Sequence, residues 1–270
     1  MLDSYAVIGN PIAHSKSPQI HTAFAQQTHQ ALQYGAILAP LDGFQAAIDN
    51  FRQQGGKGLN VTVPFKLEAY RLATRLTERA STAQAVNTLK FENDEILGDN
   101  TDGAGLVRDI ECNLGIPIGD KRVLLMGAGG AAQGVILPLL QRSPSLLAIA
   151  NRTPQKAQAL QQQFITHGNI VSGDFMHFSG ENFDLIINAT SASLHDAVPE
   201  LPAGVFAHAA LAYDMMYRPE PTPFLKFARQ NGAEQIADGI GMLVEQAAES
   251  FFLWRGVRPQ TKPVIAMLKS

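Results

Sequence analysis

The sequence predicts an α/β fold of two domains, the first built on a mainly parallel sheet and the second on a glycine-rich turn. Three observations lead to this prediction. Short apolar runs alternate with segments of helical periodicity, which is the pattern of a parallel sheet covered by helices. The run Arg122–Met126 stops abruptly at closely spaced glycines. Because that turn begins near residue 120 of a 270-residue chain, a whole domain's length of chain precedes it.

The chain ahead of the glycines alternates strands with helices. Leu59, Val61 and Val63 alternate with polar residues, so we expect these three to share one face of a strand. The predicted strands are Tyr5–Gly9, Tyr34–Leu38, Gly58–Pro64, and Ala85–Leu89 with Glu95–Leu97 as a hairpin. The predicted helices are Pro18–Thr28, Phe44–Arg52, Lys66–Leu76 and Ala104–Leu114.

Polar side chains follow these strands where each one ends. Ser15 and Ser17 come after the first strand, Lys66 comes after the third, and Asp102 begins the helix at the domain junction. Ligands of open α/β sheets bind at the carboxyl ends of strands, so these residues are candidates for a site. The alternatives are an N-cap for Ser17, a solvated helix lysine for Lys66 and a helix-start carboxylate for Asp102.

The glycine-rich turn has the properties of a phosphate-binding turn. Gly127 permits a tight turn, Gly129 lets the backbone approach a pyrophosphate, and Ala132 is small enough for close helix packing. The predicted helix Ala131–Gln141 offers free N–H groups to an anion. Gly-x-Gly-x-x-Ala alone is a weak signal, and the alternative is a tight turn in another kind of α/β protein.

The segment after the next predicted strand, Leu146–Ala150, indicates which dinucleotide binds. An acid near this point is typical of NAD, whereas a neighbouring arginine accommodates the 2′-phosphate of NADP. The chain has Asn151, Arg152 and Thr153 here and no acid, so NADP is the predicted cofactor, unless Arg152 is only a solvated charge. The predicted cofactor-binding residues of this region are Gly127, Ala128, Gly129, Gly130, Ala131, Asn151, Arg152 and Thr153.

Two further strands, Phe183–Ser191 and Leu211–Tyr217, complete the Rossmann-like NADP-binding domain, with a helix over 156–164. We expect Thr190 and Ser191 near the nicotinamide, and Met215 and Gly239 in contact with the cofactor. The helix Leu243–Trp254 should pack back on the first domain. The expected division is a substrate domain of residues 1–103 and 239–270 and an NADP-binding domain of residues 104–238, with a cleft between them.

The composition restricts the partners and the compartment. A net charge of −3 and 46% hydrophobic residues describe an ordinary globular protein without a nucleic-acid-binding surface. Cys112 is the only cysteine, so no disulfide and no thiolate metal cluster is expected. No apolar run reaches the roughly 18 residues of a membrane span, and no signal segment opens the chain. We expect a cytoplasmic protein, a monomer or homodimer, that acts on a small molecule without a metal.

These motifs occur together in one known family. The chain resembles the shikimate dehydrogenase family along essentially its full length, and its monofunctional bacterial members most closely, in Gly9–Pro18, Asn60–Lys66, Ala85–Thr88, Gly98–Gly103, Gly127–Ala131, Asn151–Thr153 and Ala237–Leu243. The resemblance implies NADPH-dependent reduction of 3-dehydroshikimate to shikimate, a step of aromatic amino acid biosynthesis, with Lys66 and Asp102 as the catalytic pair. It implies that the substrate contacts Ser15, Ser17, Thr62, Asn87, Asp102, Tyr217 and Gln246.

The chain departs from the family pattern at two places. Ala132 and Gln133 stand where the family often has Ser-Arg, which bears on the strength of NADP discrimination. Residues 192–194 stand where a glycine is common, in the loop expected near the nicotinamide.

Three other functions compete with this one. The first is a quinate/shikimate dehydrogenase that can use NAD, against which the missing acid counts. The second is a two-domain reductase of the methylenetetrahydrofolate dehydrogenase type, which would not need the serines at 15 and 17. The third is a catalytically silent NADP-binding sensor, although Lys66 and Asp102 are both intact.

Overall fold

The computed structural model describes residues 2–190, 192 and 201–269, and the chain divides into two compact units. Unit 1 comprises Met1–Gly105 and Val244–Leu268, and unit 2 comprises Leu106–Leu243. Each unit is an α/β structure, as the sequence predicts, and its described residues form one six-stranded sheet. These limits differ by a few residues from the expected boundaries after residues 103 and 238. No helix in the described part of the chain has the length and apolar character needed to cross a membrane.

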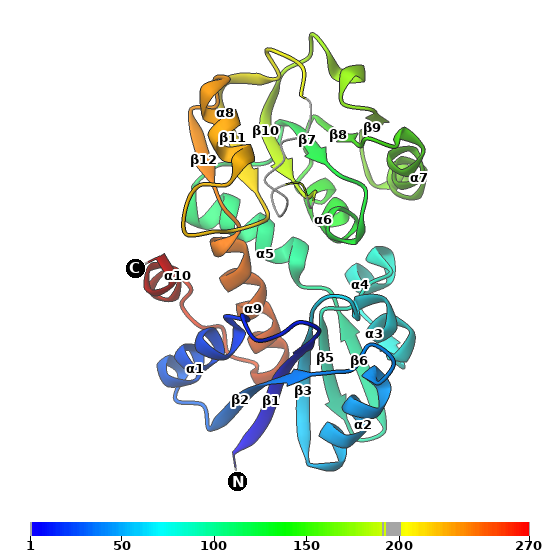
Figure 1. The fold of residues 1–270 in the computed structure, drawn as a ribbon, viewed down its shortest axis with the longest axis vertical. Helices are drawn as coiled ribbons and strands as arrows, with labels where there is room; N and C mark the ends of the chain where they lie inside the picture. Colours follow the sequence, from blue (N-terminus) through cyan, green and yellow to red (C-terminus); the bar gives the residue numbers. More distant parts are fainter. Residues whose placement is uncertain (1, 191, 193–200, 270) are drawn as a thin grey trace. The chain divides into compact units, whose positions relative to one another are not determined.

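Unit 1 carries a mixed sheet in the strand order β2-β1-β3-β5-β6-β4 (Figure 1). The first three of these strands are parallel, whereas β5 is antiparallel to both β3 and β6. The strands are β1 (Asp3–Gly9), β2 (Leu32–Leu38), β3 (Gly56–Val61), β4 (Arg75–Leu76), β5 (Thr88–Glu92) and β6 (Glu95–Asp99). The helices are α1 (Ser17–Thr28), α2 (Phe44–Gln53), α3 (Lys66–Leu72), α4 (Glu78–Ala83) and α10 (Lys262–Lys269).

Three local expectations for unit 1 were wrong. The helix that Lys66 opens ends at Leu72, because Leu76 pairs instead with Gly98 of β6. Strand β3 ends at Val61 and not at Pro64, and Val63 is 61% exposed, so it does not share the buried face of Leu59 and Val61. Ser17 is the first residue of α1, and Lys16 occupies the N-cap position without a side-chain cap hydrogen bond.

The core of unit 1 includes residues from both parts of its discontinuous chain. Helix α9 (Ile240–Arg255) begins in unit 2, and its part from Val244 onward belongs to unit 1. There Trp254 stacks on Tyr5 with ring centroids 4.7 Å apart, and its indole N–H donates to the Leu89 carbonyl at 3.0 Å. The prediction that this helix packs on the first domain is confirmed within unit 1.

Unit 2 carries a sheet of six parallel strands in the order β12-β11-β10-β7-β8-β9. Strand β8 has the predicted bounds, and β7 begins one residue before the apolar residues 123–126 expected to form it, whereas β9, β12 and α8 were not predicted. The strands are β7 (Arg122–Met126), β8 (Leu146–Ala150), β9 (Ile170–Gly173), β10 (Phe183–Asn188), β11 (Phe206–Asp214) and β12 (Gln235–Ala237). The helices are α5 (Asp102–Arg108), which begins in unit 1, a π-helical turn (Asp109–Asn113), α6 (Gly130–Leu140), α7 (Pro154–Phe164), two 3-10 turns (Ile165–His167 and Met176–Phe178) and α8 (Pro223–Gln230).

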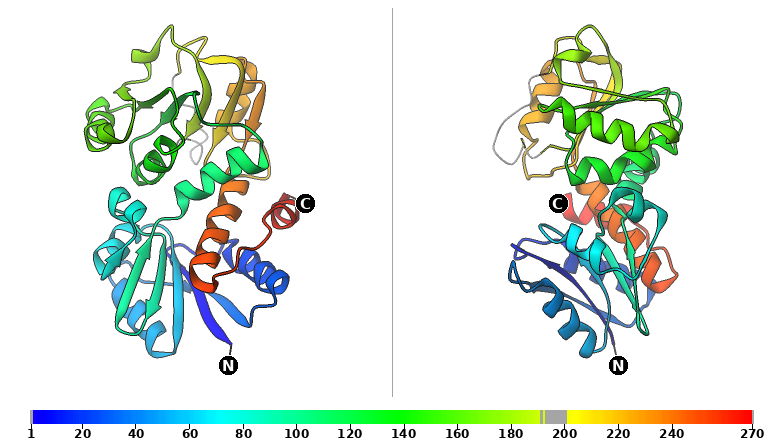
Figure 2. Two further views of the ribbon diagram at one scale, coloured as in Figure 1. Left: turned by 180° about the vertical axis from the view of Figure 1, so that it is seen from behind. Right: turned by 90° about the vertical axis from the view of Figure 1, so that its right-hand side faces the viewer.

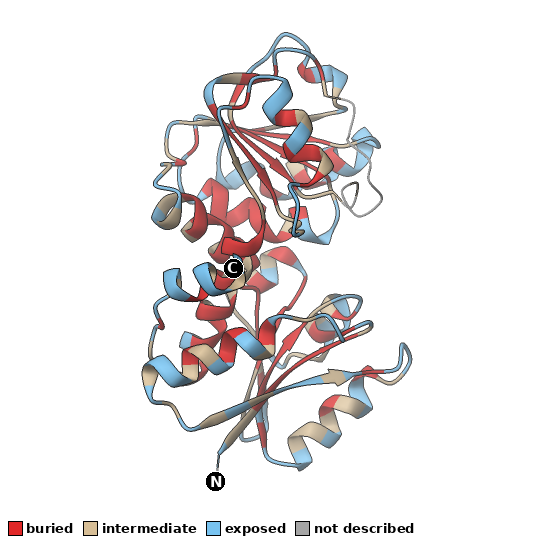
Figure 3. Cartoon of the chain, turned by 60° about the vertical axis from the view of Figure 1, so that its left-hand side comes forward, coloured by how far each residue is buried: buried red, intermediate tan, exposed pale blue. Residues whose placement is uncertain are grey.

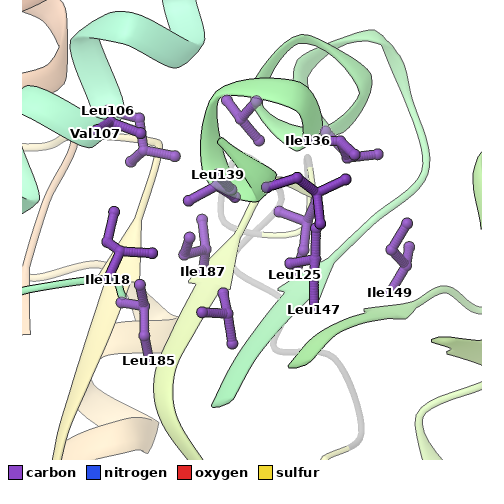
Figure 4. Close-up of a cluster of buried hydrophobic side chains, with 14 of the residues drawn as sticks. Leu106, Val107, Ile118, Leu125, Ile136, Leu139, Leu147, Ile149, Leu185 and Ile187 are labelled. Carbon is purple, nitrogen blue, oxygen red and sulfur yellow. The ribbon is translucent and has the colours of Figure 1, made fainter. Parts of the chain in front are cut away.

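Helices cover both faces of the unit 2 sheet (Figure 2). Side chains alternate along each strand, so Leu125 of β7 packs with α6 and α7 on one face, while Leu124 packs with α8 on the other. Figure 4 shows the first cluster, with Ile136 and Leu139 of α6 lying over Leu125, Leu147 and Ile187. The strands at the centre of this sheet are buried along most of their length (Figure 3). This explains why their sequences are continuous apolar runs.

Candidate active site

Lys66 and Asp102 form an ion pair at the candidate site, in unit 1. Lys66 is the first residue of α3 and Asp102 is the first residue of α5. The Lys66 Nζ atom lies 2.5 Å from Asp102 Oδ2, and the two side chains are 31% and 12% exposed. The ammonium therefore remains accessible while the carboxylate is largely withdrawn from solvent.

Asn87 holds the other oxygen of this carboxylate. Its Nδ2 atom donates to Asp102 Oδ1 at 2.8 Å and lies 3.3 Å from Gln246 Oε1 of α9. Thr101 Oγ1 also approaches Gln246 Oε1, at 3.3 Å. Lys66, Asp102, Asn87 and Gln246, four of the residues singled out in the sequence, thus belong to one hydrogen-bonded group.

A buried charged group fixes the loop that carries Asp102. Asp99 is 1% exposed, and it accepts two hydrogen bonds from the Arg79 guanidinium, at 2.7 and 2.5 Å. The Thr77 hydroxyl donates to the same carboxylate at 2.6 Å, and the Asn100 backbone N–H donates to it at 2.8 Å. These contacts hold the backbone just before Asp102, so the direction of its side chain is set by the fold.

The predicted substrate residues Ser15, Ser17 and Thr62 lie near the carboxyl ends of β1 and β3. The Ser17 amide N–H donates weakly to Ser15 Oγ, at 3.3 Å. A Cβ atom added at Gly9 would lie 2.4 Å from Thr62 Cγ2, so Thr62 packs directly over the end of β1. Among the described residues, none of the three forms a hydrogen bond with Lys66, Asp102 or Asn87.

The structure also brings in residues that sequence analysis did not single out for function. Asn60 lies on the polar face of β3, and its Nδ2 atom donates to Ser250 Oγ of α9 at 2.9 Å. The Tyr34 hydroxyl of β2 donates to Asn60 Oδ1 at 2.7 Å. Thr88 and Thr101 flank Asn87 and Asp102 in sequence and bond to the Asn87 amide. The available signals were Asn60, a polar residue between the apolar Leu59 and Val61, and Ser250 one helical turn after Gln246.

In unit 2, the glycine-rich turn lies between β7 and α6. Gly127 has a φ of 108°, in the region where glycine is favoured, and its added Cβ would meet the backbone of Ala189 at 3.2 Å. A Cβ added at Gly129 or Gly130 would meet nothing within 4 Å. The exposed first turn of α6 thus offers backbone N–H groups and open space, which fit the pyrophosphate of a dinucleotide.

Asn151, Arg152 and Thr153 follow β8, the strand next to β7. Asn151 Nδ2 donates to the Thr153 carbonyl at 2.8 Å, which shapes the turn. The Arg152 side chain is exposed, and it pairs with no acid among the described residues. Gln133 of α6 stands at a position where the family often has arginine, and its Nε2 atom donates to Gln163 Oε1 at 3.4 Å. Arg152 and Thr153 fit a 2′-phosphate ligand better than a ribose hydroxyl.

Other predicted cofactor residues follow neighbouring strands of the same sheet. Thr190 comes after β10, and its N–H and hydroxyl both donate to Asn188 Oδ1, at 3.1 and 2.7 Å. Met215 comes after β11, where its N–H donates to the Asn188 carbonyl at 3.0 Å. A Cβ added at Gly239 would lie 2.2 Å from the Met215 carbonyl oxygen, so only glycine fits this close approach. Ser191 lies outside the described residues.

Tyr217, the remaining predicted substrate residue, lies in the unit 2 loop after β11 and is half-buried. Burial raises the pKa of its phenol, so it is a hydrogen-bond donor at neutral pH. Within the described ranges, no three His, Cys, Asp or Glu side chains are grouped so that they could hold a metal ion.

Unit 2 has a parallel sheet with a dinucleotide-type turn, and unit 1 has an accessible lysine held by a carboxylate. Together these are the parts of a dinucleotide-dependent oxidoreductase. The chain belongs to the shikimate dehydrogenase family. Three family models match it: the shikimate dehydrogenase substrate binding domain over residues 7–89, shikimate / quinate 5-dehydrogenase over 112–197, and the shikimate 5'-dehydrogenase C-terminal domain over 239–269.

Relatives of high identity support the same family. The chain is 66% identical to shikimate dehydrogenase (NADP(+)) of Nitrosospira multiformis, over 100% of this chain and 98% of the relative. It is 62% identical to the protein of the same name from Dechloromonas aromatica, with the same coverage.

Solved structures agree in fold. An Ael1 enzyme from Pseudomonas putida is 54% identical with a TM-score of 0.95, covering 99% of this chain and 98% of that one. Shikimate 5-dehydrogenase from Thermus thermophilus, solved with NADP(H) and shikimate, is 31% identical with a TM-score of 0.87, covering 98% of both chains.

Proposed function

We propose that this protein catalyses the reversible NADPH-dependent reduction of 3-dehydroshikimate to shikimate, with Lys66 and Asp102 as its acid–base pair. The observation that carries the proposal is the Lys66–Asp102 contact of 2.5 Å, in a chain of this family. Asp102 is held on its other oxygen by Asn87, so Lys66 is the member of the pair that can exchange a proton. A lysine with a fixed carboxylate beside it suits general acid–base chemistry at a carbonyl oxygen.

The chemistry requires a proton donor close to the substrate ketone. When bound, NADPH supplies the hydride, and negative charge then develops on the ketone oxygen. The Lys66 ammonium stabilises that charge and donates a proton to the oxygen, while the Asp102 carboxylate keeps the ammonium in place. In the reverse direction the lysine amine accepts the proton of the hydroxyl that is oxidised.

The residues expected to hold the cofactor lie along the carboxyl edge of the unit 2 sheet. The exposed N–H groups of the α6 first turn would bind the pyrophosphate, and Arg152 with Thr153 would bind the 2′-phosphate. Thr190, Met215 and Gly239 follow neighbouring strands and would line the rest of the dinucleotide.

The proposed substrate residues have polar side chains, most of them short, as a ligand with several hydroxyls and a carboxylate needs. A site that hydrogen-bonds each hydroxyl rejects analogues that lack one. We assign this role to Ser15, Ser17, Thr62, Asn87, Asp102, Tyr217 and Gln246. The expected cytoplasmic location, the monomeric or homodimeric state and the lack of a nucleic-acid partner stay predictions.

Turnover of 3-dehydroshikimate by the purified protein tests the proposal. The loss of NADPH absorbance should depend on 3-dehydroshikimate, and NADP⁺ should be reduced when shikimate is added. Quinate and NADH, assayed in parallel, distinguish an enzyme with relaxed substrate and cofactor use. A folded protein that binds NADPH but turns over neither substrate would overturn the proposal and favour the sensor alternative.

A further inference from the structure

A fully buried carboxylate ends strand β11 in unit 2, and the proposed reaction does not use it directly. It belongs to Asp214, the last residue of the strand, which is 0% exposed. Two polar neighbours are equally buried: Asn188 at the end of β10, and Thr222 just before α8. A carboxylate taken out of water is costly unless donors surround it, so the place of Asp214 calls for an explanation beyond packing.

Three donors from three different segments meet the Asp214 carboxylate. The Asn188 Nδ2 group donates to Oδ1 at 3.2 Å, and the Met216 backbone N–H donates to the same oxygen at 3.0 Å. The Thr222 hydroxyl donates to Oδ2 at 2.5 Å. An ionised carboxylate only accepts hydrogen bonds, so the direction of each bond is fixed. One side chain thus joins the end of β10, the loop after β11 and the start of α8.

The Asn188 amide has one orientation that satisfies its neighbours. The Thr190 backbone N–H, which can only donate, lies 3.1 Å from Asn188 Oδ1, and the Thr190 hydroxyl donates to the same oxygen at 2.7 Å. The Nδ2 group therefore faces Asp214. A flipped amide would set N–H against N–H on one side and oxygen against carboxylate on the other. Through Asn188, the carboxylate thus fixes the position of Thr190.

The loop between β11 and α8, residues 215–222, is attached to Asp214 near both of its ends. Met216 donates to the carboxylate near the start of the loop, and Thr222 donates to it at the end. The Thr222 hydroxyl has one proton, which this bond uses, and its oxygen accepts from the Leu225 N–H at 3.3 Å as the N-cap of α8. Tyr217 lies between the two attachments, so the carboxylate determines the course of the backbone that carries it.

The segments that Asp214 holds carry residues assigned above to both reactants. Thr190 and Met215 are proposed cofactor residues, and the Met215 N–H also donates to the Asn188 carbonyl at 3.0 Å. Tyr217 is a proposed substrate residue. Hydride transfer needs both reactants close to the productive geometry, so a shared anchor for their contacts bears on the chemical step.

We propose that Asp214 is a positioning residue for hydride transfer, which holds Thr190 and the loop of Met215 and Tyr217 in the arrangement that the reaction needs. This inference rests on the proposed function. Because Asp214 is buried, it acts through Asn188 and the loop backbone rather than by touching a ligand. The residues proposed for the cofactor phosphates follow β7 and β8 instead, so loss of Asp214 should affect the rate more than the affinity for NADPH.

Two pairs of variants test this role. Asp214→Asn keeps the shape but places N–H groups where donors converge, whereas Asp184→Asn makes the same change near the opposite end of β10, where the carboxylate accepts from the Arg122 N–H. Thr222→Val removes the hydroxyl at nearly constant shape, and Thr222→Ser keeps it. We expect Asp214→Asn and Thr222→Val to lower kcat on the order of tenfold, equivalent to about 1.4 kcal/mol in activation free energy. The matched variants should stay within about twofold of wild type, even where Tm falls.

Binding and isotope measurements separate positioning from simple loss of stability. The dissociation constant for NADPH in Asp214→Asn should change less than about threefold, because the phosphate contacts remain. The primary isotope effect on kcat, measured with NADPH deuterated at the transferred hydrogen, should rise because hydride transfer then limits the rate more fully. A merely less stable variant keeps the wild-type isotope effect.

Several outcomes would overturn the positioning role. They are a wild-type kcat and isotope effect in Asp214→Asn and Thr222→Val, or a loss in Thr222→Ser as large as that in Thr222→Val. A loss that appears only in the affinity for NADPH has the same meaning. If Asp214→Asn fails to fold, the Thr222 pair decides by the same criteria.

A measurement on the unliganded protein does not depend on turnover. In protein labelled with carbon-13 at the methionine methyl groups, the signals of Met215 and Met216, assigned by substitution to Leu, should shift in Asp214→Asn and Thr222→Val. They should stay near wild type in Asp184→Asn and Thr222→Ser, with Met267 of unit 1 as the internal reference. Unmoved signals in both test variants overturn the inference. If the wild type fails to turn over 3-dehydroshikimate, the proposed function fails, and the methyl signals still decide whether Asp214 holds the loop.

Discussion

Lys66 and Asp102 meet through a single carboxylate oxygen, because the other oxygen is held by Asn87. The ammonium is therefore attached to one side of a carboxylate that cannot easily rotate. In an exposed surface ion pair both side chains move freely, and the contact contributes little to the stability of the fold. Here the fixed partner defines where the lysine proton lies.

The first prediction concerns this pair. Lys66→Met and Asp102→Asn should each lower kcat by on the order of 10²-fold or more, with modest changes in substrate binding, as for loss of a general acid. The double variant should lose much less than the product of the two effects, because the residues act as one unit. Steady-state kinetics with shikimate and NADP⁺ measure this, with Lys57→Met at an exposed position of β3 as the control. Additive losses would rule out the pair.

The second prediction concerns cofactor choice. Arg152→Ala should weaken the binding of NADPH by roughly 1.5–3 kcal/mol, the range of a hydrogen bond to a charged group. The binding of NADH should stay nearly unchanged. Titration of both cofactors gives the ratio of dissociation constants. Lys156→Ala removes an exposed cation from the start of the next helix and should preserve that ratio. An equal loss for both cofactors would show that Arg152 does not bind the 2′-phosphate.

The third prediction separates substrate binding from helix capping. Ser17 does not occupy the N-cap position of α1, so Ser17→Ala should raise KM for shikimate with little change in Tm. Ser15→Ala should also raise KM, with a loss of about 1 kcal/mol at most from its weak bond to the Ser17 N–H. Thr62→Val should behave like Ser17→Ala. Ser81→Ala at an exposed position of α4 is the control. A fall in Tm with constant KM would assign these residues to structure.

The fourth prediction concerns stability at acid pH. His21 is buried against Tyr34, with ring centroids 4.2 Å apart, and neither ring nitrogen has a hydrogen-bond partner among the described residues. Burial lowers the pKa of His21 from 6.5 to about 3, and the neighbouring Asn60 side chain acts in the opposite direction. In the unfolded chain the His21 imidazole therefore binds a proton below about pH 6.5, whereas in the folded chain it stays neutral until the pH falls to about 3.

Stability should accordingly fall as the pH drops through this window. From pH 8 to pH 5 the contribution of His21 amounts to a loss of about 2 kcal/mol in unfolding free energy. His21→Phe keeps the stack and should remove that part of the pH dependence in urea unfolding, whereas replacement of the exposed His14 by Gln should not. An unchanged pH dependence in His21→Phe would contradict the assignment.

The sequence patterns predicted the parts of this protein that local chemistry determines. The end of β7 and the bounds of β8 follow from apolar runs that glycine or polar residues end. The choice of Lys66 and Asp102 as candidate site residues follows from their places at the starts of helices. The early end of α3 could not be predicted, because pairing of Leu76 with Gly98 overrides helical periodicity. Contacts such as Asn60 with Ser250, 190 positions apart, depend on how α9 packs on the sheet.

Trp254 is the only tryptophan of the chain, and it joins Tyr5 and Leu89 from the far end of the sequence. During synthesis, unit 1 stays incomplete until residues beyond Val244 emerge, whereas nearly all of unit 2 has by then been made. Trp254 reaches its exposure of only 8% when that last segment docks. Its fluorescence therefore reports closure of the discontinuous unit, so refolding kinetics can time that docking without an added label.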